Sequence, residues 1–251
     1  MLRAGSSGPL KRIMSRLLLV FDFDHTIINE NSDVLVQELA PNGKIPPHIK
    51  SLYTDRGWTP FMREVFVYLH QNEVTSSQIQ NFMKALPFAP GMPALLSQLL
   101  QKQDSIEAII ISDSNECFIQ TILDDKGYTS VFEKVFTNPA SFDADGILRL
   151  KPYHQQDWCD LCTTNLCKGS VMEEHISEAT RNGNTFDCIA YIGDGSNEIC
   201  PSLRLSEHDI VFPREGYRLQ KKLKEYQNRV KCQVVSWEDA GTIWSTLQKY
   251  L

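Results

Sequence analysis

The 251-residue sequence predicts an α/β fold, in which a parallel β-sheet is flanked by helices and a small all-helical segment follows the first strand. Continuous apolar runs at Leu17–Phe23, Ile106–Ser112 and Cys188–Ile192 are typical of strands buried on both faces of a sheet. Helical patterns separate these runs, which favours parallel strands joined by right-handed crossovers. Residues 31–86 contain helical patterns without a strong strand signal, which indicates the inserted helical segment.

Two shorter apolar runs, His208–Phe212 and Gln233–Trp237, extend the predicted sheet, and a final helix follows the second of them. Three helices are expected between the strands. One begins at Met92 after the turn at Pro90-Gly91, and the others span Asn115–Lys126 and Ser170–Arg181. Gly127 occupies the C-cap position that would end the second of these helices.

Two capping signals predict where helices begin in the inserted segment. Thr59 followed by Pro60 resembles an N-cap with proline at the first helical position, and Thr75 with Gln78 resembles a capping box. The apolar residues after these signals recur at helical spacing and define the expected inward faces: Phe61, Val65, Phe66, Leu69, Ile79, Phe82, Met83 and Leu86. The chain is expected to return to the sheet near Pro87.

The predicted organisation has three parts: a tail at residues 1–16, an α/β core formed by residues 17–30 and 87–251, and the helical segment at 31–86. The first 16 residues contain four basic side chains and no acid. This pattern favours a flexible N-terminal tail, with a mitochondrial presequence as the alternative.

Composition narrows the functional classes. The 25 Lys and Arg against 31 Asp and Glu give a net charge of −6, which argues against a general nucleic-acid-binding surface. No apolar stretch approaches the ~18 residues of a membrane span. Seven cysteines without a visible secretory signal favour reduced thiols and a cytoplasmic protein.

Acidic residues follow the predicted strands. Asp22 and Asp24 follow the first strand, and Asp194 lies between two glycines after the third. Because the carboxyl ends of parallel strands meet at one edge of a sheet, these side chains would form an oxygen-rich pocket suited to Mg²⁺. Each has a simpler alternative: the Asp pair could cap a turn, and Asp194 could belong to an ordinary strand–helix turn.

The second strand also ends in a polar cluster. The Ser112 hydroxyl and the neighbouring amides are suited to hold a phosphate oxygen. Asp113 and Asn115 are open to two interpretations, because either could bind a ligand or cap the helix that follows.

Seven short motifs follow one another along the chain: DFDHTIINENSD at 22–33, IISDSN at 110–115, FTNPASF at 136–142, NLCK at 165–168, YIGDGSNE at 191–198, CPS at 200–202 and PREGY at 213–217. In the order of these motifs the sequence resembles the haloacid dehalogenase-like phosphatases. Within them it is most similar to the phosphoethanolamine/phosphocholine phosphatase family and its pyridoxal phosphate phosphatase relatives. This resemblance implies a Rossmann-like core with a small all-helical cap that closes over the site.

The resemblance also implies residue roles. Asp22 would be the nucleophile that forms an aspartyl phosphate, and Asp24 the general acid and base. The Asp22 carboxylate, the Asp24 backbone carbonyl and the Asp194 carboxylate would hold Mg²⁺.

Further positions would contact the substrate. Ser112 and a lysine would hold phosphate oxygens; Lys168 is the first candidate for that lysine and Lys151 the second. Asp33 and Asp113 match substrate-binding acids of the family and would favour a cationic group on the substrate. For Asp33 the alternative is an ordinary residue at a helix N-terminus.

Two positions depart from the family pattern. The usual GDGxND motif is GDGSNE, so Glu198 replaces an aspartate and the effect on metal affinity is open. His25 stands where relatives often carry Glu or Asn, and no role is assigned to it.

A cysteine-rich stretch precedes Lys168. His154, Cys159, Cys162 and Cys167 could offer one nitrogen and three sulfurs to a structural zinc ion. The alternative is a compact loop with buried free thiols, and a thioredoxin-like redox pair is less favoured. Cys200 is expected to pack in the core beneath the site.

The sequence therefore predicts a Mg²⁺-dependent phosphomonoesterase acting on a small molecule, with pyridoxal 5'-phosphate favoured as the substrate. Phosphoethanolamine or phosphocholine is the alternative within the family. Outside it, the alternatives are a catalytically weak regulatory binding module, a phosphotransferase and a dehalogenase. The second Asp of DxD argues against a dehalogenase.

Overall fold

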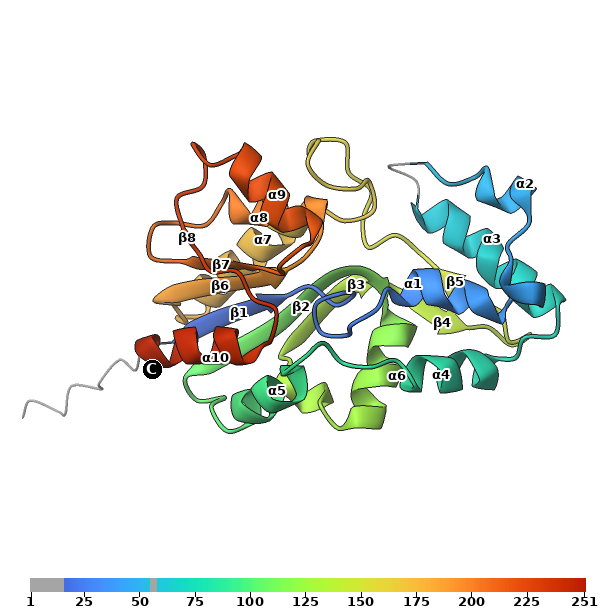
Figure 1. Ribbon diagram of the computed structural model, residues 1–251, viewed down its shortest axis with the longest axis horizontal. Coiled ribbons are helices and arrows are strands. Elements are labelled where there is room, and N and C mark those ends of the chain that lie inside the picture. Colours follow the sequence, from blue (N-terminus) through green and yellow to red (C-terminus); the bar gives the residue numbers. More distant parts are fainter. Residues whose placement is uncertain (1–15, 55–57) are drawn as a thin grey trace, which may run out of the picture.

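The computed structural model describes residues 16–54 and 58–251 and has a six-stranded, fully parallel sheet at its centre. The strand order is β3-β2-β1-β6-β7-β8 (Figure 1). The strands are β1 (Leu17–Phe21), β2 (Ile106–Asn115), β3 (Lys134–Asn138), β6 (Cys188–Gly193), β7 (Ile210–Pro213) and β8 (Gln233–Val234). The parallel α/β fold predicted from the apolar runs is confirmed.

Helices cover both faces of the sheet (Figure 1). Leu17, Leu19 and Phe21 of β1 belong to the same buried cluster as the core residues of α5, α6 and α10. Leu18 and Val20 point to the opposite face and belong to the cluster that contains the core residues of α7, α8 and α9. These helices are α5 (Met92–Leu100), α6 (Glu116–Lys126), α7 (Lys168–Arg181), α8 (Ile199–Ser202), α9 (Arg218–Glu225) and α10 (Gly241–Leu247).

Residues 31–86, in their described part, contain helices and no strand. The helices are α1 (Ser32–Leu35), η1 (Val36–Leu39), η2 (Pro41–Gly43), α2 (Pro47–Lys50), α3 (Trp58–Gln71) and α4 (Ser76–Lys84). They lie at one end of the sheet in Figure 1. Their buried side chains join the core cluster of α5 and α6; for example, the rings of Phe66 and Phe118 are 5.7 Å apart in an edge-to-face contact. The division into a core and a cap remains a prediction.

The chain leaves and re-enters the α/β part at adjacent points. Ile28 pairs with Phe88 in an antiparallel bridge, and the Asn29 amide donates to the Pro87 carbonyl at 2.8 Å. A short hairpin of β4 (Ala140–Phe142) and β5 (Leu148–Leu150) lies beside α3, where Arg63 Nε donates to the Leu150 carbonyl at 2.7 Å. The remaining short helices are η3 (Thr129–Val131), η4 (Ser196–Glu198) and η5 (Gln248–Tyr250).

Several local predictions are confirmed and others are wrong. The Thr75–Gln78 capping box forms, Asn115 caps α6, and Gly127 adopts the left-handed C-cap conformation with φ 75°. Thr59 is not an N-cap, because α3 already includes Trp58.

The predicted ends of several elements also differ from the structure. Helix α7 begins at Lys168, two residues before the predicted start, and the last strand covers only Gln233–Val234. Strand β2 runs three residues beyond Ser112, to Asn115.

Most of the predicted N-terminal tail, residues 1–15, lies outside the described residues. Arg16 belongs to the folded part, because its amide donates to Asp187 Oδ2 at 3.0 Å and its Nη2 donates to Glu107 Oε2 at 2.6 Å. Across residues 16–54 and 58–251, no helix is both long and apolar enough to cross a membrane.

Candidate active site

The predicted strand-end residues line one cavity of about 260 Å³ at the carboxyl edge of the sheet. Asp22 and Asp24 come from the loop after β1, and Asp194 follows β6. Lys168 and Glu198 reach the same cavity from the start of α7 and from η4. Tyr53 and Trp58 from the helical segment also line it, so the cavity lies between that segment and the sheet.

A bulge in the sheet places polar residues near the end of β2 beside the cavity. Ile111 pairs with Phe136 and Asn115 pairs with Asn138, so three residues of β2 lie opposite one residue of β3. Such a bulge interrupts the ladder and redirects side chains. Ser112 and Asp113 lie within it and therefore face the cavity rather than the neighbouring strand.

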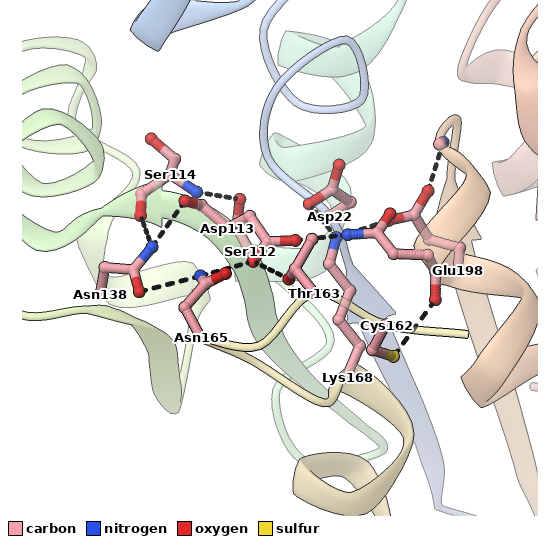
Figure 2. Close-up of polar contacts among 12 residues, drawn as sticks. Asp22, Ser112, Asp113, Ser114, Asn138, Cys162, Thr163, Asn165, Lys168 and Glu198 are labelled. Carbon is pink, nitrogen blue, oxygen red and sulfur yellow. Dashed lines mark hydrogen bonds and ion pairs between the residues drawn. The ribbon is translucent and has the colours of Figure 1, made fainter. Parts of the chain in front are cut away.

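Lys168 links two acidic segments. Its Nζ donates to Asp22 Oδ1 at 2.6 Å and to Glu198 Oε1 at 2.5 Å, and its side chain is 1% exposed (Figure 2). Burial alone would lower the pKa of Lys168, but the charges of Asp22 and Glu198 outweigh it and hold that pKa well above its usual value. The lysine is therefore a fixed positive charge beside Asp22.

Three carboxylates converge on one point. One oxygen each from Asp22, Asp194 and Glu198 lies within 4.8 Å of the others. Burial, together with the charges of Glu198 and Asp22, raises the pKa of Asp194 to about 9. Hard oxygen donors crowded in this way match the ligand set of a divalent cation such as Mg²⁺, which would relieve their repulsion.

Two glycines make room for Glu198, the residue that departs from the family motif. A Cβ on Gly193 would lie 2.7 Å from Glu198 Cγ, and one on Gly195 would lie 2.8 Å from Glu198 Oε2. Glu198 Oε2 also accepts the Gly195 amide. The longer side chain thus folds back over the loop while its other oxygen contacts Lys168.

Asp24 lies apart from these three carboxylates. Its Oδ1 accepts the Ser32 amide at 3.0 Å. Burial raises the pKa of Asp24 well above its ordinary value, the charge of Asp33 adds to the effect, and the Ser32 amide opposes it. His25 follows in the left-handed region with φ 54°, and its ring is 5.3 Å from that of Tyr217.

Asp113 is held by a polar network that the sequence did not reveal (Figure 2). Its Oδ1 accepts from Thr163 Oγ1 at 3.0 Å and from Asn165 Nδ2 at 2.8 Å, and its Oδ2 accepts from Asn197 Nδ2. Ser112 is 1% exposed, and its hydroxyl accepts the Ser114 amide at 3.2 Å.

Asp33 lies in the first turn of α1, which agrees with the alternative of a residue at a helix N-terminus, and it also lines the cavity. Asn31 is the N-cap of α1, and its side chain accepts the Val34 amide at 2.9 Å. Asp33 Oδ2 accepts from Trp58 Nε1 at 2.6 Å. Burial raises the pKa of Asp33 to about 6, although the hydrogen bond from Trp58 opposes the rise.

The cysteine prediction needs a correction. Cys159, Cys162 and Cys167 do converge, but their fourth neighbour is Cys200 rather than His154. His154 Nε2 accepts the Cys167 amide at 2.8 Å and so caps the start of α7. Lys151, the second candidate for the phosphate-binding lysine, is not among the residues that line the cavity.

Solved structures define the class by its fold. Phosphoserine phosphatase in its apo form aligns with a TM-score of 0.60 at 15% identity, covering 94% of this chain and 100% of that chain. A phospho-aspartyl intermediate analogue of phosphoserine phosphatase gives 0.58 at 14% identity, covering 94% of this chain and 99% of that chain. The chain therefore shares the overall fold of these phosphoserine phosphatase structures.

Sequence comparisons give the family. The putative phosphatase family matches residues 17–251. The pyridoxal phosphate phosphatase of Bos taurus is 42% identical over 236 residues, which cover 93% of this chain and 98% of the relative. The phosphoethanolamine/phosphocholine phosphatase of Gallus gallus is 35% identical over 240 residues, covering 94% and 89%. The chain belongs to the putative phosphatase family, and its enzyme class is phosphatase.

Proposed function

We propose that this phosphatase is a Mg²⁺-dependent phosphomonoesterase that forms an aspartyl phosphate on Asp22, and that its substrate is pyridoxal 5'-phosphate. The observation that carries the proposal is the contact of Lys168 Nζ with Asp22 Oδ1 at 2.6 Å, in a cavity that also contains Ser112 and Asp194. A nucleophilic carboxylate, a fixed cation and hydrogen-bond donors then face one incoming phosphate.

In the first step, an Asp22 oxygen attacks phosphorus and the bond from phosphorus to the leaving oxygen breaks. Lys168 and Ser112 stabilise the negative charge on the non-bridging oxygens as it develops. A Mg²⁺ ion held by Asp22 and Asp194, with the Asp24 carbonyl as the third expected ligand, would supply further positive charge.

Asp24 is the residue that donates a proton to the leaving oxygen and later accepts one from water. Its raised pKa favours the protonated carboxyl, which donates to the leaving oxygen as the ester bond breaks. Asp24 then takes a proton from the water that attacks the phosphoryl group on Asp22. That attack releases inorganic phosphate, restores the Asp22 carboxylate and returns the proton to Asp24.

Two observations bear on the substrate. The 42% identity to a pyridoxal phosphate phosphatase, against 35% to a phosphoethanolamine/phosphocholine phosphatase, favours pyridoxal 5'-phosphate. The second candidate, phosphocholine or phosphoethanolamine, is favoured by the pairing of Asp33 with Trp58 beside the cavity, because a carboxylate and an indole together attract an ammonium group. We also propose a cytoplasmic location, since none of the seven cysteines forms a disulfide and a reducing compartment keeps cysteines in that state.

The test compares hydrolysis of pyridoxal 5'-phosphate, phosphoethanolamine, phosphocholine and an aryl phosphate, each with and without Mg²⁺. We expect Mg²⁺-dependent turnover with the highest kcat/KM on pyridoxal 5'-phosphate. The Asp22→Asn variant should lose turnover by orders of magnitude, whereas Asp104→Asn, at an exposed position away from the cavity, should keep it. Turnover without Mg²⁺, or retained in Asp22→Asn, contradicts the mechanism; a higher kcat/KM on phosphocholine contradicts the substrate.

A further inference from the structure

A cluster of four cysteines lies outside the catalytic cavity, although it adjoins that cavity. Cys159 and Cys162 come from the loop before α7, Cys167 is the N-cap residue of α7, and Cys200 lies in α8. All four are buried, with exposures between 0% and 8%. Their four sulfur atoms lie within 4.8 Å of one another, and none forms a disulfide.

The sulfur spacing matches a tetrahedral metal site. Four sulfurs at the usual zinc–sulfur distance of about 2.3 Å lie about 3.8 Å apart at the corners of a tetrahedron. Cys200 Sγ is 3.6 Å from Cys159 Sγ and 3.9 Å from Cys167 Sγ, on either side of that value. A disulfide would need about 2.05 Å and would engage only two of the four sulfurs.

We propose that Cys159, Cys162, Cys167 and Cys200 bind one structural Zn²⁺ ion. Four protein ligands leave no open position, so the ion would hold the loop together rather than take part in the reaction. Because the ligands are soft thiolates, the site would prefer zinc to the magnesium expected at the carboxylates.

The surroundings suit a negatively charged metal–thiolate centre. Four thiolates and one Zn²⁺ carry a net charge of −2, and Arg204 lies beside Cys200. A Cβ on Gly169 would be 2.5 Å from Arg204 Nε and 2.7 Å from Cys200 Sγ, so the glycine lets the guanidinium group and the sulfur approach each other. Burial of a doubly charged centre is less unfavourable when a fixed cation is this close.

Hydrogen bonds from Gln156 order the loop that contains two of the proposed ligands, Cys159 and Cys162. Gln156 is 4% exposed; its Oε1 accepts the Cys159 amide at 2.8 Å, and its Nε2 donates to the carbonyls of Cys159 and Thr163. The loop that contains Cys159 and Cys162 is thus ordered by a buried side chain that offers no sulfur. Outer interactions of this kind orient the ligands of metal sites.

The site also explains how active-site residues are held, and this part rests on the proposed function. Cys167 immediately precedes Lys168, and Cys200 follows Glu198 by two residues, so both ends of the Lys168–Glu198 ion pair are attached to ligands. Thr163 and Asn165, which donate to Asp113, lie in the loop between Cys162 and Cys167. The metal would therefore fix three contacts of the cavity from outside it.

The experiment measures metal in the full-length protein purified without chelator. We expect about one zinc per chain by elemental analysis, and four sulfurs at about 2.3 Å from the metal by X-ray absorption on the unmodified protein. Cys159→Ser and Cys200→Ser should each reduce the zinc content several-fold. Cys117→Ser and Cys232→Ser, which alter cysteines outside the cluster, should retain it.

Unmodified protein that contains no zinc overturns the proposal, as does zinc whose nearest ligands are oxygen or nitrogen. Mass spectrometry that finds a disulfide among the four cysteines has the same consequence. The X-ray absorption measurement needs no variant, so it decides the question even where a serine substitution prevents folding. Metal content and ligand type are independent of turnover, so failure here is distinguishable from failure of the proposed phosphatase mechanism.

Discussion

The Lys168→Met substitution tests the charge arrangement at the cavity, because it removes the cation that separates two buried carboxylates. Lys168 Nζ lies 2.6 Å from Asp22 Oδ1 and 2.5 Å from Glu198 Oε1, and the lysine side chain is 1% exposed. Loss of one partner of a buried ion pair costs about 3–5 kcal/mol. At about 2–4 °C per kcal/mol for a chain of this size, Tm should fall by about 6–20 °C.

Lys134→Met is the matched control. Lys134 Nζ lies 2.7 Å from Glu178 Oε2, a similar distance, but the two side chains are 38% and 49% exposed. Exposed ion pairs contribute about 0–1 kcal/mol, so the Tm of this variant should be close to that of the unmodified protein. The comparison isolates burial, since both substitutions remove a lysine that contacts a glutamate.

The loss of stability in Lys168→Met should depend on pH, and the pKa of Glu198 determines the direction of that dependence. Burial raises the pKa of Glu198 to about 7, and Lys168 opposes the rise, so removing the lysine raises this pKa further. A carboxyl group with a raised folded-state pKa destabilises the fold above its ordinary pKa of about 4, where the unfolded chain ionises freely. The Tm deficit of Lys168→Met should therefore be larger at pH 8 than at pH 5.

Thermal unfolding of the three proteins at both pH values, without added metal, is the assay. A Lys168→Met variant whose stability lies within about 1 kcal/mol of that of Lys134→Met at pH 8 would show that the buried Lys168 ion pairs do not stabilise the fold. A Tm deficit that grows as the pH is lowered would contradict the expected direction of the pH dependence.

Three further predictions concern the neighbouring groups. Mg²⁺ should raise the Tm of the unmodified protein, and Asp194→Asn should abolish that rise, because it removes one of three converging carboxylates; an unchanged rise in thermal unfolding would place the ion elsewhere. Asp33→Asn should lower kcat/KM about tenfold, or about 1.4 kcal/mol, on amine-bearing esters only; an equal loss on an aryl phosphate would exclude a role in specificity. Gly193→Ala should destabilise the fold by about 1–3 kcal/mol in denaturant unfolding, since its Cβ would meet Glu198 Cγ at 2.7 Å; an unchanged midpoint would show that Glu198 is free to move.

The fold could be predicted where burial leaves a clear pattern. Strands β1, β2 and β6 are apolar runs because they lie inside the sheet with helices on both faces. Strand β3 was missed because it is an edge strand: Lys134 and Val135 are partly exposed, and the mixed sequence KVFTN resembles a loop. The three-residue strands of the β4–β5 hairpin are too short to leave a periodic signal.

The site could be predicted where the chain order itself brings residues together. Asp22 and Asp194 follow parallel strands and Ser112 lies near the carboxyl end of a third, so the topology alone gathers them at one edge. Cys200 is 33 residues from Cys167, and only the packing of α8 against α7 makes them neighbours. His154 is close in sequence to the cysteines, yet its ring is directed to a backbone amide.

The Asp113 partners were missed for a related reason. Asn165 and Asn197 lie in quoted motifs and Thr163 in a loop, but nothing in these segments shows that all three donate to Asp113, because that contact forms only when the chain folds. Trp58 likewise contacts Asp33 within the helical segment, across 25 residues of chain. Polar residues in loops carry no periodicity, so a single sequence offers no signal for such networks.

Identification of the phosphorylated residue tests directly whether Asp22 is the nucleophile. The enzyme is quenched during turnover, reduced with borohydride and digested, and its peptides are analysed by mass spectrometry, because borohydride converts a phosphoaspartate to homoserine. We expect homoserine at position 22 only when substrate and Mg²⁺ are both present. Homoserine at another aspartate, or steady hydrolysis with Asp22 unmodified at every quench time, would show that Asp22 is not the nucleophile.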